Sequence, residues 1–152
     1  MALALRIPPP LLALASAAVM FGLARLLPPL AWNRTATLAA TLVLVGLGLA
    51  IELAAIIAFR RAKTTINPLT PNASSQLVTA GLYRYSRNPM YVGLCLQLLA
   101  WATFLAAPLA LLGVVLFILL VSYLQILPEE RALNARFGDD YRRYLSQTKR
   151  WL

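Results

Sequence analysis

Hydrophobic residues gather into long runs separated by short polar stretches. The four longest runs are 11–27, 35–59, 90–106 and 108–127. A helix needs about 20 apolar residues to cross the hydrocarbon core of a bilayer, so each run is close to the length of a spanning helix. The pattern predicts an all-α integral membrane protein with about four transmembrane helices. Only Ala107 lies between the last two runs, which predicts a tight helical hairpin.

Two polar segments, 64–89 and 128–152, interrupt this pattern. Turn signals such as Asn67-Pro68 mark the first segment as a loop. In the second, apolar residues recur at helical spacing among charges and predict an amphipathic helix; they are Leu133, Phe137, Tyr141, Tyr144 and Leu145. We expect a single domain over 1–152, in which the two segments form a cap at the membrane surface.

The chain is strongly basic, with 14 lysines and arginines, five acids and a net charge of +9. Nucleic acid and anionic lipid headgroups are the two partners that such a charge can serve. The basic residues flank the apolar runs, which favours the lipid bilayer and argues against nucleic acid. Arg60, Arg61 and the arginines of the tail place the 64–89 loop and both termini on the cytoplasmic side.

The sequence excludes several kinds of chemistry. Histidine is absent, and Cys95 is the single cysteine. Histidine acid–base catalysis, a disulfide within the chain and a thiolate zinc site are therefore ruled out. We expect no metal.

Two polar clusters lie at the two ends of the predicted hairpin, at 77–91 and 128–131. A hairpin brings its ends to one side of the membrane, so the clusters are expected to face each other. Two interpretations are open. Arginines and tyrosines can anchor helices at the headgroups, while acids suit a helix start. Alternatively, the clusters enclose a site.

The motifs in these clusters resemble those of a known family. Residues 87–91, Arg-Asn-Pro-Met-Tyr, with Gly93 resemble the Arg-His-Pro-x-Tyr-x-Gly motif of membrane methyltransferases. Residues 128–130, Pro-Glu-Glu, and the tail that follows are similar to the paired-glutamate motif of the same enzymes. Over 64–152 the chain resembles isoprenylcysteine carboxyl methyltransferases and, more distantly, phospholipid N-methyltransferases.

This resemblance implies a site for S-adenosylmethionine and a lipophilic, membrane-borne methyl acceptor. The positions that would line the cofactor are Leu77, Val78, Tyr83, Asn88, Pro89, Met90, Tyr91 and Glu129. Tyr83 and Tyr91 are suited to stack on adenine or contact the cationic donor, although tyrosines also serve as interfacial anchors. No metal or covalent nucleophile is needed, because an activated methyl group only has to be aligned and shielded from water.

Two positions depart from the family pattern. Asn88 replaces the histidine, and an amide keeps hydrogen bonding but cannot carry charge. Gln125 stands where the carboxyl methyltransferases place a substrate-binding arginine, which argues against a prenylcysteine carboxylate as substrate. Gln125 and Glu129 are four positions apart and are expected to share a helix face as the catalytic pair.

The remaining acids leave alternatives open. Glu129 is the expected partner of the cofactor's hydroxyls or ammonium. Glu130 is expected either to support the site by pairing with Arg84 or Arg87, or simply to favour a helix start. Glu52, inside the second run, is expected to pair with Arg60 or Lys63 or to contact substrate.

Two rival functions remain. A sterol-reductase-like enzyme would share the Arg-His-Pro-x-Tyr stretch but use NADPH. A non-catalytic adaptor or small-molecule carrier would bind no nucleotide-like ligand.

Overall fold

The computed structural model describes residues 7–62 and 76–152, and these form helices joined by short connections. The elements in chain order are α1 (Pro9–Ala24), α2 (Arg34–Arg61), η2 (Gly81–Arg84), α3 (Pro89–Leu105), η3 (Pro108–Ala110), α4 (Leu111–Val121), the π-helical turn η4 (Ser122–Ile126) and α5 (Leu127–Gln147). Within these residues the predicted all-α fold is confirmed. The predicted turn at Asn67-Pro68 and the candidate ion-pair partner Lys63 lie outside the described residues.

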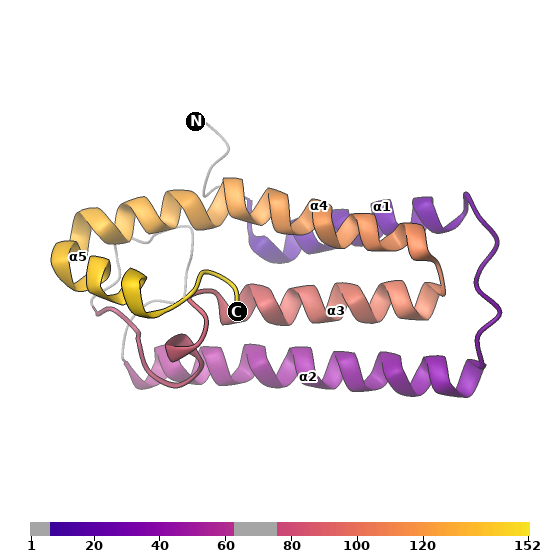
Figure 1. Cartoon of the computed structure of the whole chain (residues 1–152), viewed down its shortest axis with the longest axis horizontal. Coiled ribbons are helices and arrows are strands. Elements are labelled where there is room, and N and C mark those ends of the chain that lie inside the picture. The colour runs from indigo at the N-terminus through magenta and orange to yellow at the C-terminus, as the bar shows by residue number, and fades with distance from the viewer. Residues whose placement is uncertain (1–6, 63–75) are drawn as a thin grey trace.

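The helices α1 to α4 lie along one long axis, and α5 continues α4 beyond the bundle before bending back (Figure 1). Local signals fix several helix ends. The Asn33 side chain accepts a hydrogen bond from the Ala36 amide at 3.0 Å and starts α2. Two arginines, Arg60 and Arg61, end it, where cations suit the helix dipole. The predicted hairpin is confirmed: Ala106 adopts a left-handed φ of 48° between α3 and η3.

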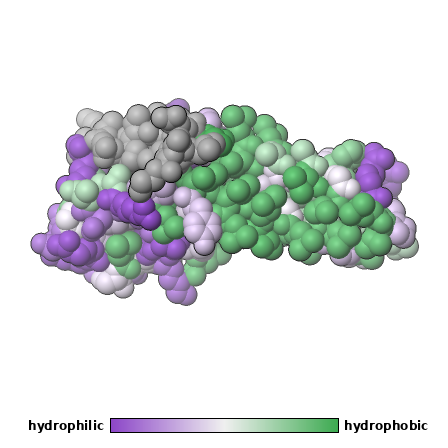
Figure 2. Space-filling model, turned by 90° about the horizontal axis from the view of Figure 1, so that it is seen from above, coloured by the Kyte–Doolittle hydropathy of each residue, from purple (hydrophilic) through white to green (hydrophobic). Residues whose placement is uncertain are grey.

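The surface of the bundle is apolar along most of its length (Figure 2). Of the 28 residues of α2, the buried ones are Gly48 and Ala55, whereas leucines such as Leu42 and Leu53 are more than half exposed. Among the described residues, the helices Arg34–Arg61 and Pro108–Gln147 are long and apolar enough to cross a membrane, and α1 and α3 are shorter apolar helices. Outward-facing leucines on so apolar a helix indicate contact with lipid. The chain is therefore membrane-associated.

Small residues let the helices approach closely. A Cβ added at Gly48 would lie 2.9 Å from the Gly93 carbonyl oxygen, so α2 and α3 meet backbone to backbone. A Cβ at Gly113 would overlap Cγ of Met20, so the missing side chain lets α4 pack closely against this methionine of α1. The Trp101 indole donates to the Ala17 carbonyl at 3.1 Å and joins α3 to α1.

Two irregularities shape the end of the bundle that carries the polar cap. Pro128 has no amide hydrogen, and a proline ring clashes with the carbonyl four residues earlier. That residue, Leu124, lies in the widened π-helical turn η4. Further on, Gly138 adopts φ 52° and ψ −119°, which only glycine adopts readily, and this bends α5 back over the bundle.

Candidate functional site

A cavity of about 300 Å³ lies where the two polar clusters meet. Its walls come from α2, α3, η4, α5, the start of α1 and the segment 76–88. The described residues that line it are Pro9, Pro10, Glu52, Ile56, Phe59, Gln76, Leu77, Val78, Tyr83, Arg87, Asn88, Met90, Tyr91, Leu94, Ile126, Glu129, Glu130, Leu133, Tyr141 and Tyr144. Arg87 and Glu130 form an ion pair of 3.1 Å, which confirms that the clusters come together.

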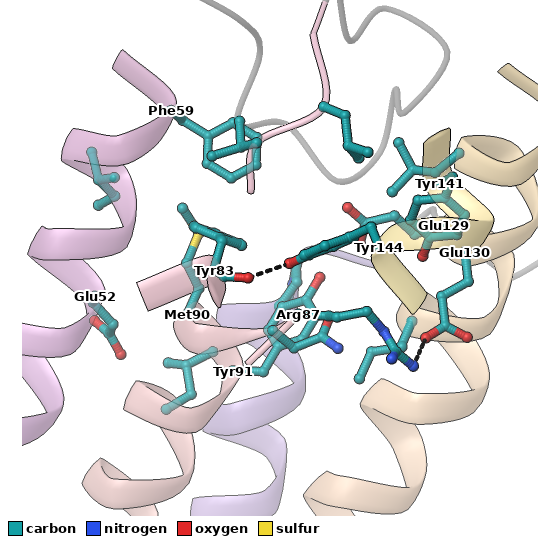
Figure 3. A pocket seen from close by; sticks show the side chains of 18 of the residues that line it. Glu52, Phe59, Tyr83, Arg87, Met90, Tyr91, Glu129, Glu130, Tyr141 and Tyr144 are labelled. Atoms are coloured by element: carbon teal, nitrogen blue, oxygen red, sulfur yellow. Dashed lines mark hydrogen bonds and ion pairs between the residues drawn. The ribbon is translucent and has the colours of Figure 1, made fainter. Parts of the chain in front are cut away.

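Aromatic side chains form the outer wall of this cavity. Tyr83 packs edge-on against Phe59, with ring centroids 5.3 Å apart. The Tyr144 hydroxyl donates to the Tyr83 carbonyl at 2.7 Å, which ties α5 to η2 (Figure 3). Burial raises the pKa of the Tyr83 hydroxyl, and the negative charge of Glu129 adds to the effect. Tyr83 therefore stays neutral and can donate a hydrogen bond to a ligand.

Glu129 is one of two neighbouring carboxylates that the start of α5 presents to the cavity. Burial raises its pKa to about 7, the neighbouring Glu130 adds to the rise, and a hydrogen bond with Tyr91 lowers it. A carboxyl group with such a pKa is divided between its two protonation states near neutral pH. A cationic ligand would favour the ionised form.

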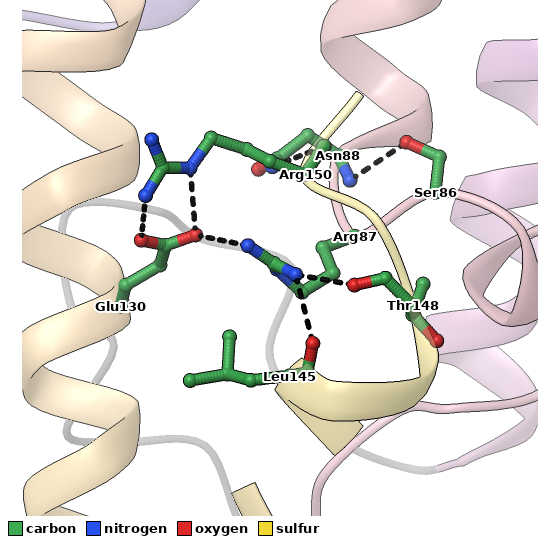
Figure 4. A network of polar contacts seen from close by, with 7 residues as sticks. All are labelled: Ser86, Arg87, Asn88, Glu130, Leu145, Thr148 and Arg150. Carbon is green, nitrogen blue, oxygen red and sulfur yellow. Dashed lines mark hydrogen bonds and ion pairs between the residues drawn. The ribbon is translucent and has the colours of Figure 1, made fainter. Parts of the chain in front are cut away.

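Arg87 and Glu130 form the centre of a polar network under the cavity (Figure 4). Glu130 also accepts two hydrogen bonds from Arg150, at 3.0 and 2.7 Å. The Arg87 guanidinium donates to the carbonyls of Thr148 and Leu145, and its backbone amide donates to the Lys149 carbonyl at 2.9 Å. This network holds the last residues of the chain against the loop that precedes α3.

Asn88 extends the network. Its side-chain amide donates to the Arg150 carbonyl at 2.9 Å, and its backbone amide donates to the Ser86 hydroxyl at 3.1 Å. It lines the cavity while it fixes the tail. A neutral amide suffices for this role, because the bond needs a donor and no charge.

We predict that Glu130→Ala loosens the tail. The substitution leaves Arg87, whose side chain is 13% exposed, without its carboxylate, and removing one partner of such a pair costs roughly 3 kcal/mol. Trypsin cleavage after Lys149 should become faster, and the melting temperature in detergent should fall. Asp139→Ala is the control, because its ion pair with Arg142 is 60% and 87% exposed and contributes less than about 1 kcal/mol. Equal behaviour of the two variants would contradict the prediction.

Seven of the positions predicted to line the cofactor border the cavity: Leu77, Val78, Tyr83, Asn88, Met90, Tyr91 and Glu129. Pro89 does not. It is buried as the first residue of α3, where its fixed φ suits a helix start, so it positions its neighbours. Arg84 is exposed and its carbonyl accepts from the Thr148 hydroxyl, so Arg87 is the arginine that pairs with Glu130.

The expectation that Gln125 shares the cavity face with Glu129 is wrong in its geometry. Gln125 is fully buried outside the cavity lining, and its amide donates to the Ile7 carbonyl. The expectation assumed a regular helix of 3.6 residues per turn. The π-helical turn Ser122–Ile126 changes that register and turns Gln125 towards the residues before α1.

Other contributions to the site differ from the sequence-based expectations. Glu52 lines the cavity, but its hydrogen-bond partner is Gln97 at 2.9 Å and not Arg60. Arg150, one of the tail arginines used to assign the orientation, pairs with Glu130. Pro9 and Pro10 join the wall from the far end of the sequence. An acid inside an apolar run is unusual, and this marked Glu52 as a candidate site residue. Nothing in the sequence pattern indicated the roles of Gln97 or Arg150.

The charges around the cavity favour a cationic ligand. Among the described lining residues the acids are Glu52, Glu129 and Glu130, while Arg87 is a cation already paired with Glu130. Within 7–62 and 76–152 no group of three or more metal-binding side chains occurs. The remaining lining is aromatic or aliphatic, so the cavity suits an amphipathic small molecule with a positive charge.

Comparison with known proteins gives the chain its family. A family model described as phospholipid methyltransferase matches residues 36–140, well over half of the chain and including both Tyr91 and Glu129. An uncharacterized protein of Haemophilus influenzae is 51% identical over 63 residues, which are 41% of this chain and 100% of that protein. No solved structure matches the chain. The chain belongs to the phospholipid methyltransferase family, and this membership indicates methyl transfer as its general activity.

Proposed function

We propose that this protein transfers a methyl group from S-adenosylmethionine to a lipophilic small molecule that enters from the bilayer. The observation that supports it most is that Tyr83, Tyr91 and Glu129 meet in one cavity, which apolar residues of the bundle such as Ile56 and Leu94 also line. The family match covers all three of these residues and most of the helices that position them.

The residues present fit the proposed methyl donor. S-adenosylmethionine supplies an activated methyl group on a positively charged sulfur. Glu129 can accept hydrogen bonds from its ammonium or its ribose hydroxyls, and Tyr83 and Tyr91 offer ring faces to adenine or to the cation. Leu77, Val78 and Met90 exclude water around the reacting groups. The tail held by Glu130 keeps these walls together.

Calorimetric titration of the purified protein in detergent tests this proposal. S-adenosylmethionine should bind with a dissociation constant in the micromolar range, on the order of −8 kcal/mol. NADPH should not bind, because its phosphates need free cations and Arg87, the arginine among the described lining residues, is paired with Glu130. Binding of NADPH without binding of S-adenosylmethionine would favour a reductase, and binding of neither would favour an adaptor.

We further propose that α1, α2, α3 and the helix from Pro108 onward all cross the membrane, with both termini and the cavity on the cytoplasmic side. The clustering of basic residues at the cavity end supports this orientation: Arg60 and Arg61 end α2, and Arg142, Arg143 and Lys149 lie in the tail. The opposite end carries the apolar hairpin turn around Ala106.

Cysteine labelling tests the orientation. In a Cys95→Ala background, Pro29→Cys and Ser146→Cys place thiols at exposed positions near opposite ends of the bundle. A membrane-impermeant maleimide added to intact cells should label Pro29→Cys and leave Ser146→Cys unlabelled until the cells are opened. The reverse pattern would place the cavity outside, and labelling of both in intact cells would contradict the four-span arrangement.

A further inference from the structure

Glu52 stands apart from the other acids of the chain because it lies inside an apolar helix. It is eight residues before Arg60 on α2, which at 1.5 Å per residue puts it about 12 Å deeper in the bundle. Its side chain lines the cavity from the α2 side, whereas Glu129 lines it from the α5 side (Figure 3). The two carboxylates therefore mark a deep wall and an outer wall of one cavity.

Backbone contacts between two helices place Glu52. A Cβ added at Gly93 would lie 2.5 Å from Cγ of Glu52 and 2.9 Å from the Gly48 carbonyl oxygen. The missing side chain lets Glu52 lie flat against α3. Gln97, one turn beyond Gly93, then donates its amide to Oε1 of Glu52 at 2.9 Å. One oxygen of the carboxylate is thus fixed, and the group retains lone pairs for a ligand.

Among the described residues, no cation pairs with Glu52. Arg87 of the same cavity is bound to Glu130. Burying an acid without a cationic partner in an apolar bundle is energetically unfavourable. Such acids occur mainly where they bind a ligand or transfer a proton. A carboxylate ligand would be repelled here, whereas an N–H or O–H group would be bound.

We propose that Glu52, oriented by Gln97, binds the reacting group of the methyl acceptor, and that this group is an amine or a hydroxyl and not a carboxylate. The inference rests on the proposed methyl transfer and specifies its acceptor. The apolar part of the acceptor would lie along Leu94, Ile126 and Leu133, which line the same cavity.

The proposed contact also accounts for the proton. The lone pair of the acceptor's nitrogen or oxygen forms the new bond to the methyl carbon as the carbon–sulfur bond breaks. The electron pair of that bond stays on sulfur, which becomes a neutral thioether. The N–H or O–H proton passes to Glu52, whose negative charge is neutralised as the positive charge on sulfur is lost. Atoms and charges balance without any other reactant.

The test combines Glu52→Gln with separate measurements of donor binding and methyl transfer. Glutamine keeps the size and a hydrogen bond to Gln97 but removes the charge and the basic oxygen, so the melting temperature should stay close to that of the wild type. Binding of S-adenosylmethionine should weaken far less than transfer does, while transfer of labelled methyl into a membrane lipid extract should fall at least about 50-fold. Gln97→Leu should lower transfer less and chiefly raise KM for the extract.

The labelled product identifies the acceptor group. N-methyl and O-methyl ether products resist alkali, and cation exchange retains the amine but not the ether; either product supports the inference. Label released as methanol by alkali would reveal a methyl ester and overturn it. Unchanged transfer in Glu52→Gln would overturn it too, since an interhelical hydrogen bond alone predicts that result. Failure of the wild type to bind S-adenosylmethionine would instead refute the proposed function itself.

Discussion

Replacing Glu129 with glutamine is expected to weaken binding of S-adenosylmethionine by about 100-fold, because a charge-assisted hydrogen bond contributes roughly 1.5–3 kcal/mol. The carboxylate lines the cavity beside Tyr91, and the substitution changes little in size. Calorimetry on the two proteins measures the difference. Asp139→Asn is the control for net charge, since Asp139 is exposed and lies outside the cavity lining. Equal affinity in the Glu129 variant and the control would contradict the proposed role.

The raised pKa of Glu129 gives this binding a pH dependence with a definite sign. Its pKa is about 7, so below pH 7 the carboxyl group must lose a proton before it can bind a cation. Affinity for S-adenosylmethionine should therefore rise with pH, by up to about tenfold per unit below 7, and level off above it. The glutamine variant should show a flat profile over the same range, pH 5.5 to about 7.5, with no carboxyl group to titrate at this position.

The protein without ligand should show the opposite trend in stability. A folded-state pKa near 7, raised from 4.5, means that the folded chain holds a proton that the unfolded chain releases. This contribution to stability is fully present below about pH 4.5 and is lost as pH rises to 7. Glu129→Gln should remove it, so the melting temperature of the variant should fall less between pH 5 and about 7.

Gly93→Val is expected to destabilise the protein by roughly 3 kcal/mol, since overpacking of a close contact has about this effect. The new side chain would overlap Cγ of Glu52 and the Gly48 carbonyl oxygen, and the second of these belongs to a backbone that cannot rotate away. The helices α2 and α3 must separate, which also displaces the deep wall of the cavity. Thermal unfolding in detergent and loss of S-adenosylmethionine binding both report the effect.

Gly46→Val provides the matched control for this prediction. Gly46 lies in α2, the helix that Gly93 of α3 contacts, and a Cβ added at Gly46 meets nothing within 4 Å. The same substitution should therefore change the stability by less than about 0.5 kcal/mol. If both variants unfolded at the same temperature, the close contact between α2 and α3 at Gly93 would not be what stabilises the deep wall of the cavity.

The sequence predicts the helices well because each carries strong local signals. The run 35–59 becomes Arg34–Arg61, with Asn33 as its N-cap, and 90–106 becomes Pro89–Leu105, opened by a proline. The tail predicted from the spacing of Tyr141 and Tyr144 is helical, and both tyrosines are buried. The length of an apolar run and the residues that start or end a helix are local features of the sequence. They therefore predict helices without any knowledge of the fold.

The errors arise where distant residues decide the outcome. Gln125 leaves the face of Glu129 because a π-helical turn precedes Pro128, and the spacing of polar residues does not reveal a change of helical period. Arg150 pairs with Glu130 because Gly138 folds the tail back, which lets the chain end reach the start of α5. Glu52 finds Gln97 across two helices that approach at glycines. Contacts between such distant positions depend on the packing of the whole bundle.

The most direct measurement of the central claim is transfer of methyl-labelled S-adenosylmethionine to organic-extractable material by the purified protein in membrane lipid. The wild type should place label in the organic phase in proportion to time and protein, and Glu129→Gln should lose at least about 99% of this rate at limiting donor. Label that stays in the aqueous phase while the protein binds the donor would contradict a methyltransferase acting on a lipophilic acceptor.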